Sequence, residues 1–243
     1  MKTEEYIKMR KLEDSHFWFL GKRFFVKTYL KKADFPKRKK LKILDLGCGT
    51  GGMTNFLKAF GTVTGIEGSE VAVDFSRKRG LNVFKQDINE FSISGSFDLV
   101  TLFDVLYHEN IKDEVEILKK VKKILMPGGY VLITDSALDI LKSKHDEEVM
   151  GKRRYTVKSM DDLVKQSGFE IVNSSYIFFS IFPLIFLKRT VLDKLFPAKK
   201  SDVGTVDGIT NSFLLNLLKI EAYFLNFFSF PLGSSIIVLA KNK

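Results

Sequence analysis

Cysteine, histidine and proline are scarce in this sequence of 243 residues, which contains one cysteine, three histidines and five prolines. The single cysteine, Cys48, cannot form a disulfide within the chain. The three histidines and Cys48 show no spacing that is typical of a metal site. We therefore expect neither a disulfide nor a bound metal, and a chain without disulfides fits a reducing, cytoplasmic compartment.

Long hydrophobic runs are missing as well. The longest largely apolar stretch, residues 176–187, includes Pro183 and is shorter than the roughly 20 residues that a membrane-spanning helix requires. The first residues lack the combination of positive charge, apolar core and small-residue cleavage site that marks a secretory signal. We expect a cytoplasmic protein, and contact with a membrane surface stays open.

Lysine and arginine are abundant and unevenly placed. The net charge is +10, and residues 1–42 contain 14 Lys/Arg against 5 Asp/Glu. A basic segment of this kind is attracted to the phosphates of RNA or to an anionic membrane surface, and the alternative is a solvated helix face. With 45% apolar residues the chain can bury one substantial core, so we expect a single domain.

Apolar runs and helical patterns alternate from residue 42 to about residue 178. This alternation of strands and helices predicts a parallel sheet with helices on both faces. The patterns predict strands at 41–47, 62–68, 81–87, 97–105, 128–136, 169–178 and 234–242. They predict helices at 53–61, 69–79, 111–125 and 155–169.

A phenylalanine-rich segment precedes the last predicted strand. Residues 176–232 contain ten phenylalanines. The prolines in this region and the polar residues 199–208 predict two helical segments joined by a loop. The segment extends the core, forms a dimer face or contacts a membrane surface, and the sequence leaves these three hypotheses open. We divide the chain into a basic helical lid at 1–41, an α/β core at 42–178, a helical insert or cap at 179–232, and a last strand at 233–243.

The segment LDLGCGTGG, residues 44–52, places four glycines within residues 47–52. Gly47, Gly49 and Gly52 satisfy the pattern G-x-G-x-x-G, and Glu67 ends the next predicted strand, where a ribose-binding acid belongs. Glycines let the backbone approach a ligand closely, and a carboxylate accepts hydrogen bonds from both ribose hydroxyls. NAD and S-adenosylmethionine both carry such a ribose, so this spacing is compatible with either cofactor.

Asp45 distinguishes between the two candidate cofactors. A carboxylate just before the glycine loop repels the pyrophosphate of a dinucleotide but suits the ammonium end of a methionine moiety. The segment 44–52 resembles the first motif of class I S-adenosylmethionine-dependent methyltransferases, and the resemblance continues through GIEGS, KQDI, FDLVTLFDVLYH and LMPGGYVLIT. It implies a Rossmann-like α/β fold: a seven-stranded, mostly parallel sheet with helices on both faces, an N-terminal helical lid and a helical insert before the last strand.

The resemblance also implies a cofactor site for S-adenosylmethionine, with S-adenosylhomocysteine as the product. Glu67 matches the family's ribose acid, Asp87 its acceptor for the adenine amine, and Asp104 its residue at the cofactor rim. The full set of expected cofactor contacts is Asp45, Gly47, Cys48, Gly49, Glu67, Gly68, Asp87, Ile88, Asp104 and Val105.

Candidate catalytic residues are few. A general base is needed only when the acceptor is a weakly acidic hydroxyl or a protonated amine. His108 follows the fourth strand at the carboxyl edge of the sheet, and Tyr155 lies in the loop after the fifth strand, so we name both as candidates. The alternative for His108 is a surface or capping role. His145 and Arg154 lie in the same loop as Tyr155 and either overhang the site or belong to a solvated charged loop.

The stretch HFWFLGKRFF, residues 16–25, contains the only tryptophan and four phenylalanines. His16, Trp18 and Arg23 resemble a segment found in a subset of the family, and in many relatives of this fold the residues before the first strand form a helical lid. The functional hypothesis is a lid that excludes water and positions an anionic acceptor through Arg23. The alternative is ordinary packing of an amphipathic helix.

The acceptor is less constrained by the sequence. Family members that methylate the amines of nucleic-acid bases carry an Asn/Asp-Pro-Pro-aromatic motif after the fourth strand, where this chain has FDVLYH, so a nucleic acid is disfavoured. The phenylalanine-rich insert exceeds what a small soluble metabolite requires. We expect O- or N-methylation of a small-molecule or lipid-linked acceptor. An RNA methyltransferase and a non-catalytic cofactor-binding protein are the alternatives, and a homodimer stays open.

Overall fold

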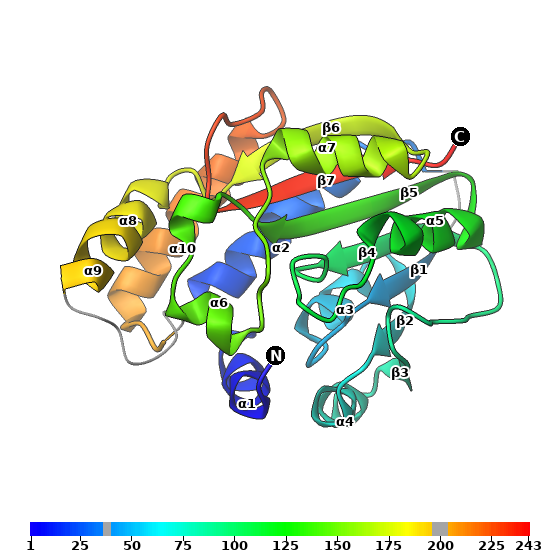
Figure 1. Ribbon diagram of the computed structural model, residues 1–243, viewed down its shortest axis with the longest axis horizontal. Helices are drawn as coiled ribbons and strands as arrows, with labels where there is room; N and C mark the ends of the chain where they lie inside the picture. Colours follow the sequence, from blue (N-terminus) through cyan, green and yellow to red (C-terminus); the bar gives the residue numbers. More distant parts are fainter. Residues whose placement is uncertain (36–39, 196–203) are drawn as a thin grey trace.

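A seven-stranded sheet forms the centre of the molecule in the computed structural model, which describes residues 1–35, 40–195 and 204–243 (Figure 1). The strand order is β3-β2-β1-β4-β5-β7-β6, and β7 is antiparallel to both of its neighbours while the other pairs are parallel. The strands are β1 Leu41–Leu46, β2 Gly61–Glu67, β3 Asn82–Lys85, β4 Phe97–Phe103, β5 Leu125–Ser136, β6 Glu170–Ile177 and β7 Ser235–Lys241.

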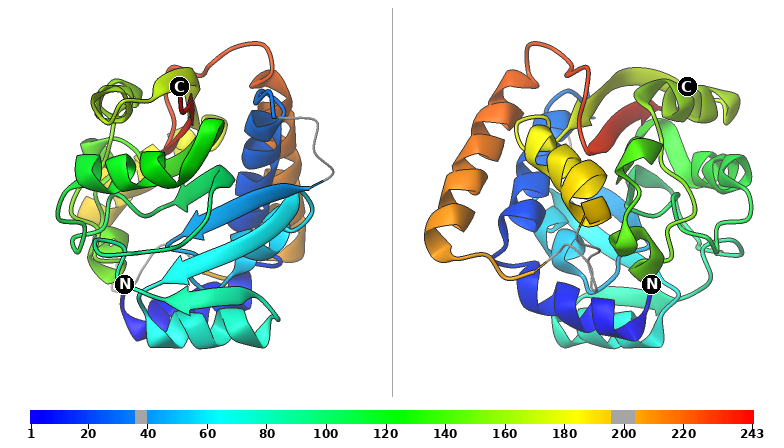
Figure 2. Two further views of the ribbon diagram at one scale, coloured as in Figure 1. Left: turned by 90° about the vertical axis from the view of Figure 1, so that its right-hand side faces the viewer. Right: turned by 60° about the vertical axis from the view of Figure 1, so that its left-hand side comes forward.

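Helices cover both faces of this sheet (Figure 2). Helices α2, α3 and α10 share one core with the sheet, and α5 and α7 share the other. The α-helices are α1 Thr3–Leu12, α2 Phe17–Leu30, α3 Gly52–Leu57, α4 Glu70–Lys78, α5 Glu114–Ile124, α6 Lys144–Glu148, α7 Val157–Gln166, α8 Phe182–Leu187, α9 Asp193–Leu195 and α10 Gly208–Phe224. Short 3₁₀ and π-helical turns lie at Asp139–Leu141 and Lys188–Leu192.

The two cores explain why the central strands are almost continuously apolar. In β4, Leu99 packs toward the α2 side and Val100 toward the α5 side, and all seven residues of this strand are buried. A parallel sheet covered on both faces needs apolar side chains in both directions, so alternation is lost in its central strands. The sequence prediction of the fold class is therefore confirmed.

The strand order places the ends of β1 and β4 at the topological switch point. Crossovers from β1 lead to one side of the sheet and those from β4 to the other. Open α/β sheets bind ligands in the crevice at the carboxyl ends of such strands. The loop after β1, Glu67 at the end of β2 and Asp104 after β4 all meet at this edge.

Some elements differ from the sequence prediction. Helix α3 is shorter than predicted, and β5 begins at Leu125, three residues early, because its first part pairs with Phe97 across an irregular register. Helix α6 was not predicted, since its five residues are too few for an apolar periodicity. Part of the predicted polar loop at 199–208, and Pro36, Lys37, Arg38 and Lys39 of the basic segment, lie outside the described residues.

The phenylalanine-rich insert packs against the N-terminal region through α10. Helices α2 and α10 lie side by side and run in the same direction (Figures 1 and 2). The Thr28 hydroxyl donates to the Ala222 carbonyl at 3.1 Å. A Cβ on Gly21 would lie only 2.4 Å from Leu218 Cδ1, so a glycine inside α2 permits this close approach. The inner side of α10 thus completes the core over β5, β7 and β6.

Candidate active site

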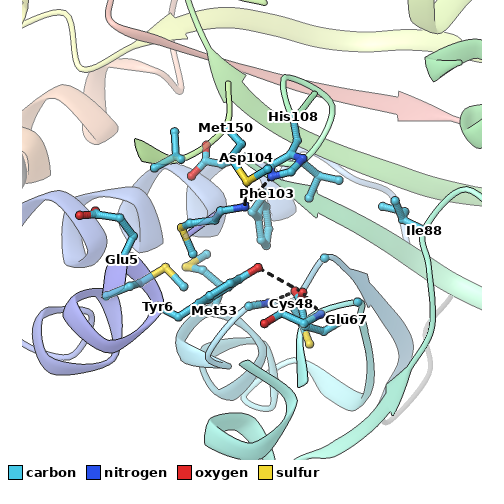
Figure 3. A pocket seen from close by; sticks show the side chains of 18 of the residues that line it. Glu5, Tyr6, Cys48, Met53, Glu67, Ile88, Phe103, Asp104, His108 and Met150 are labelled. Atoms are coloured by element: carbon cyan, nitrogen blue, oxygen red, sulfur yellow. Dashed lines mark hydrogen bonds between the residues drawn. The ribbon is translucent and has the colours of Figure 1, made fainter. Parts of the chain in front are cut away.

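A cavity of about 760 Å³ lies at the carboxyl edge of the sheet. Its walls come from α1, α2, the glycine loop, the ends of β2, β3 and β4, and the segment around His145 and Met150 (Figure 3). All ten expected cofactor contacts line it: Asp45, Gly47, Cys48, Gly49, Glu67, Gly68, Asp87, Ile88, Asp104 and Val105. The structure therefore brings these ten residues together around one space.

Gly47 and Gly49 of the glycine loop both adopt a backbone conformation that favours glycine. Gly47 has a φ of +71° and Gly49 a φ of +54°, in the left-handed region that side chains disfavour. A Cβ on Gly47 would also lie 2.6 Å from Val105 Cγ2. The backbone can therefore form the floor of the cavity without a side chain between it and a ligand.

Glu67 is fixed at the end of β2 by the backbone around it. Its carboxylate accepts hydrogen bonds from the Gly49 amide at 2.8 Å and the Ser69 amide at 2.9 Å. The Tyr6 hydroxyl of α1 points to the same carboxylate from across the cavity at 3.4 Å (Figure 3). The acid is thus preorganised and faces the cavity, as a ribose-binding residue must.

Asp87 lies farther along the same wall. Its Oδ1 accepts hydrogen bonds from both the backbone amide and the side-chain amide of Asn89, each at 2.8 Å. The residue therefore shapes the turn after β3 and lines the cavity at the same time.

Asp45 lies beneath the loop with both of its oxygens bonded. The hydroxyls of Thr54 and Thr101 donate to it, each at 2.7 Å. Burial raises the pKa of Asp45 to about 6, although these two hydrogen bonds oppose the shift. Asp45 is thus firmly positioned, and its expected role toward an ammonium group stays a prediction.

Asp104 is held in an uncommon backbone conformation with a φ of +56°. Its carboxylate forms an ion pair with Lys22 of α2, whose side chain is buried, while Asp104 itself is partly open to the cavity. The sequence reasoning did not name Lys22, although it lies inside the HFWFLGKRFF stretch. Helix α2 is thereby tied to the end of β4 directly at the site.

His108 lines the cavity near Met150 and Asp104 (Figure 3). Its Nδ1 accepts a hydrogen bond from the Asn110 amide at 3.2 Å. Burial, followed by the positive charge of the Met1 amino group, lowers the pKa of His108 to about 4. Its Nε2 lies 2.7 Å from the Met1 amino nitrogen. With this low pKa the imidazole is neutral at physiological pH and a weak proton acceptor, so its expected role as a general base stays a prediction.

Other predicted site residues lie elsewhere. Tyr155 is buried beside the cavity wall, where its hydroxyl donates to the Leu106 carbonyl at 3.0 Å. Arg154 forms a buried bidentate ion pair with Asp146. His16 caps α2 by accepting from the Trp18 amide at 3.2 Å, and Arg23 donates to the Glu13 carbonyl. None of these four is among the described residues that line the cavity, whereas Trp18 and His145 are.

Helix α1 contributes cavity residues that the sequence reasoning missed. Tyr6 and Met9 of α1 line the cavity, and so does Glu13, which follows the helix. Glu13 pairs with Arg79, the residue after α4, and Arg79 also contacts Asp14 at 2.9 Å. These contacts join two elements distant in sequence, and no local pattern in residues 1–15 indicates them.

Cys48 is buried against Val73, Leu81 and Val83. Burial raises the pKa of its thiol, so the sulfur stays protonated and does not act as a nucleophile. In the described ranges, no three His, Cys, Asp or Glu side chains are arranged to hold a metal ion.

Comparison with known proteins agrees with this site. Residues 37–173, more than half of the chain, match the methyltransferase-domain family. The chain therefore belongs to the class I S-adenosylmethionine-dependent methyltransferases. Members of this class are enzymes that use S-adenosylmethionine as cofactor, and a structural neighbour, a phosphoethanolamine N-methyltransferase of Haemonchus contortus, contains it.

Individual relatives cover different parts of the chain. Demethylmenaquinone methyltransferase of Staphylococcus aureus is 33% identical over 114 residues, which are 43% of this chain and 46% of that protein. Phosphoethanolamine N-methyltransferase 1 of Zea mays is 30% identical over 147 residues, 54% of this chain and 28% of that protein. An S-adenosylmethionine-dependent methyltransferase of Thermotoga maritima shares the fold with a TM-score of 0.60, at 17% identity, over 99% of this chain and 95% of its own. The matches to the first three curated relatives thus span 28% to 46% of their lengths.

Proposed function

We propose that this enzyme transfers a methyl group from S-adenosylmethionine to an oxygen or nitrogen of a small-molecule or lipid-linked acceptor. The observation that carries the proposal is the cavity itself. It joins the ten expected cofactor contacts to a wall made largely of apolar and aromatic side chains, among them Met9, Trp18, Phe19, Val149 and Met150.

The residues present fit the cofactor. Glu67 is positioned to accept hydrogen bonds from the ribose hydroxyls, and Asp87 and Ile88 lie beyond it, where the adenine would be held. Gly47 and Gly49 leave the backbone open to the methionine portion, next to Asp104. When bound, S-adenosylmethionine supplies an activated methyl group on a sulfonium.

The chain's own contribution is then to position an acceptor and to exclude water. Orientation of this kind can lower a barrier by up to roughly 7–11 kcal/mol. The wall near Asp104 is formed by Trp18 and Phe19 of α2 and by Val149 and Met150 of the segment after β5. His108 on the same wall is the candidate base, and it would act only if an acceptor displaces the Met1 amino group from its Nε2 and raises its pKa from about 4.

Relatives support a small acceptor. Those matched by this chain include enzymes named for demethylmenaquinone, for ubiquinone biosynthesis and for phosphoethanolamine. A quinone acceptor would suit the apolar wall, and the exposed apolar surface of the insert supports contact with a membrane that supplies such an acceptor.

The basic N-terminal segment gives less support to RNA than its charge suggests. Four of its basic residues form ion pairs with acidic side chains of the same chain: Lys2, Arg10, Lys22 and Arg23. An RNA methyltransferase is therefore an outcome of the experiment below and not the proposal. The non-catalytic cofactor-binding protein is a second such outcome.

Turnover with cofactor labelled in its methyl group tests the proposal. The wild-type enzyme is incubated with a membrane extract, a soluble metabolite pool and total RNA, and His108→Asn serves as a matched variant. We expect label in the lipid-soluble or small-molecule fraction. Label in RNA alone contradicts the proposed acceptor class, and label in none of the three, with S-adenosylhomocysteine still bound, supports the non-catalytic alternative.

A further inference from the structure

The outer side of α10 is mainly apolar, with the exposed Asn216 between Phe213 and Ile220. Within the helix the exposed apolar residues recur at intervals of three, four and seven, so they lie on one side of it, and Phe227 and Phe228 follow after its end at Phe224. Ile209 is 86% exposed, Phe227 67% and Phe213 66%. We call this set the α10 apolar face; it consists of Ile209, Phe213, Ile220, Tyr223, Phe224, Phe227 and Phe228.

The position of α10 does not depend on this face. Its opposite side is buried through Leu218, Ala222 and Leu225, which pack on α2 and the sheet (Figure 2). The fold is thus complete without any cover on the outer side. Water-exposed apolar patches of this extent are rare on monomeric proteins and mark interaction surfaces.

Charge around the face is positive except at the first turn of α10, where the exposed N-cap Asp207 lies. Across residues 208–232, all of them described, the acidic residue is Glu221 alone, and it is buried. Lys219 lies exposed at the border of the face, and Lys27 and Lys31 are exposed on the neighbouring helix α2. A surface that complements this arrangement is therefore apolar and negatively charged.

A second copy of the chain fits this surface poorly. Both copies in a two-fold symmetric dimer through α10 would carry the same lysines at its border, and the exposed acid of this helix, Asp207, lies only at its first turn. An anionic lipid surface instead offers hydrocarbon to the phenylalanines and phosphates to the lysines, whose stems can extend along the apolar layer. None of the helices in the described ranges is long and apolar enough to cross a membrane, so contact would be made at the surface.

We propose that the α10 apolar face docks on an anionic membrane surface, with the aromatic side chains in the interfacial layer and Lys219, Lys27 and Lys31 near the headgroups. The first turn of α10 lies beside the cavity wall, because Asn211 accepts a hydrogen bond at 2.7 Å from the amide of Phe17, next to Trp18. The docked enzyme would thus present its cavity close to the lipid. Docking itself does not depend on the proposed function; only the idea that the membrane supplies the methyl acceptor rests on it.

Sedimentation with lipid vesicles tests the face directly. The full chain is mixed with vesicles of equal parts phosphatidylglycerol and phosphatidylcholine, and with pure phosphatidylcholine, at low and high salt. We expect binding to the anionic vesicles that weakens at high salt, because salt screens the lysines. Phe224→Ser, at a residue 42% exposed, should weaken binding about tenfold. Phe84→Ser, at a residue 45% exposed on β3 at the opposite edge of the sheet, should leave it unchanged.

A charge-matched pair gives a second measurement. Lys219→Glu should weaken binding to anionic vesicles more than Lys78→Glu, which makes the same charge change on α4. Equal effects within either pair overturn the proposal, as does a wild-type protein that stays in the supernatant at low salt. A light-scattering mass of two chains that Phe224→Ser reduces to one also overturns it, because the face would then join two copies. Binding of S-adenosylhomocysteine, measured on every variant, separates loss of docking from failure of the methyltransferase site.

Discussion

Individual residues at the site combine a ligand-facing role with a structural one. Glu67 faces the cavity and also accepts two backbone amides that shape the loops after β1 and β2. Asp45 faces the cavity floor and joins Thr54 of α3 to Thr101 of β4. Substitutions at these residues therefore need readouts that separate binding from folding.

Glu67→Ala should weaken S-adenosylhomocysteine binding at least tenfold. The variant loses hydrogen bonds to a charged acceptor, worth about 1.5–3 kcal/mol each. Asp87→Ala should cost less, because that side chain is expected to accept a single bond from the adenine amine. Isothermal titration of both variants, with folding checked by circular dichroism, makes the comparison. A larger loss for Asp87→Ala would mean that the two roles are misassigned.

Asp45→Asn should change how stability depends on pH. The pKa of Asp45 is raised from 3.8 to about 6, so the folded state holds this proton more tightly than the unfolded state. Its contribution is fully present below pH 3.8 and is lost as the pH rises to about 6, a difference of roughly 3 kcal/mol. Urea unfolding at pH 4 and pH 7 should show the wild-type protein losing most of that amount relative to Asp45→Asn. Parallel pH dependence in both proteins would contradict the assigned pKa.

At the scale of whole elements, the insert is connected to the site by an aromatic stack. The Glu221 carboxylate of α10 accepts the amides of Phe179 and Ser180, both at 2.9 Å. The preceding residue, Phe178, is buried with a φ of +61°, and its ring stacks on Trp18 at 3.9 Å. Glu221 thus holds the turn that places Phe178 behind a cavity-lining residue.

Glu221→Ala should lower the free energy of unfolding by about 3 kcal/mol, because it leaves two partly buried amides without an acceptor. It should also shift the fluorescence of Trp18, the sole tryptophan, since the stacked Phe178 loses its support. Asp207→Ala is the matched control on the same helix: it removes an exposed N-cap, should cost about 1 kcal/mol, and should leave the emission spectrum unchanged. An unaltered spectrum in Glu221→Ala would separate the insert from the site.

For the molecule as a whole, the N-terminal helices, the sheet and the insert share their interior. Residues from α2, β1, β4 and α10 belong to one buried cluster, so 1–35 and 204–243 are parts of the same core despite their distance in sequence. The four sequence segments proposed as domains stay a prediction about organisation. The shared core indicates that they do not fold independently.

Unfolding should therefore be a single transition. Trp18 reports on the contact between α2 and Phe178, and far-ultraviolet circular dichroism reports on all helices and strands. The two signals should change at the same urea concentration, as they do in a two-state protein. An earlier midpoint for Trp18 would show that α2 and the insert separate before the sheet.

The sequence alone determined the fold class and the cofactor side of the site. The period of the apolar residues, the four glycines after β1, and the acids Glu67 and Asp87 at strand ends are local features, and a parallel sheet brings all strand ends of one kind to one edge. Tertiary structure decided the rest, because long-range contacts carry no local pattern. Only the fold showed that Tyr6 of α1 and Glu13 after it close the cavity, that Lys22 pairs with Asp104, and that Tyr155 and Arg154 are held away from the cavity. It also decided which side of α10 is core and which side faces outward, since an almost uniformly apolar helix has no polar side to indicate its orientation.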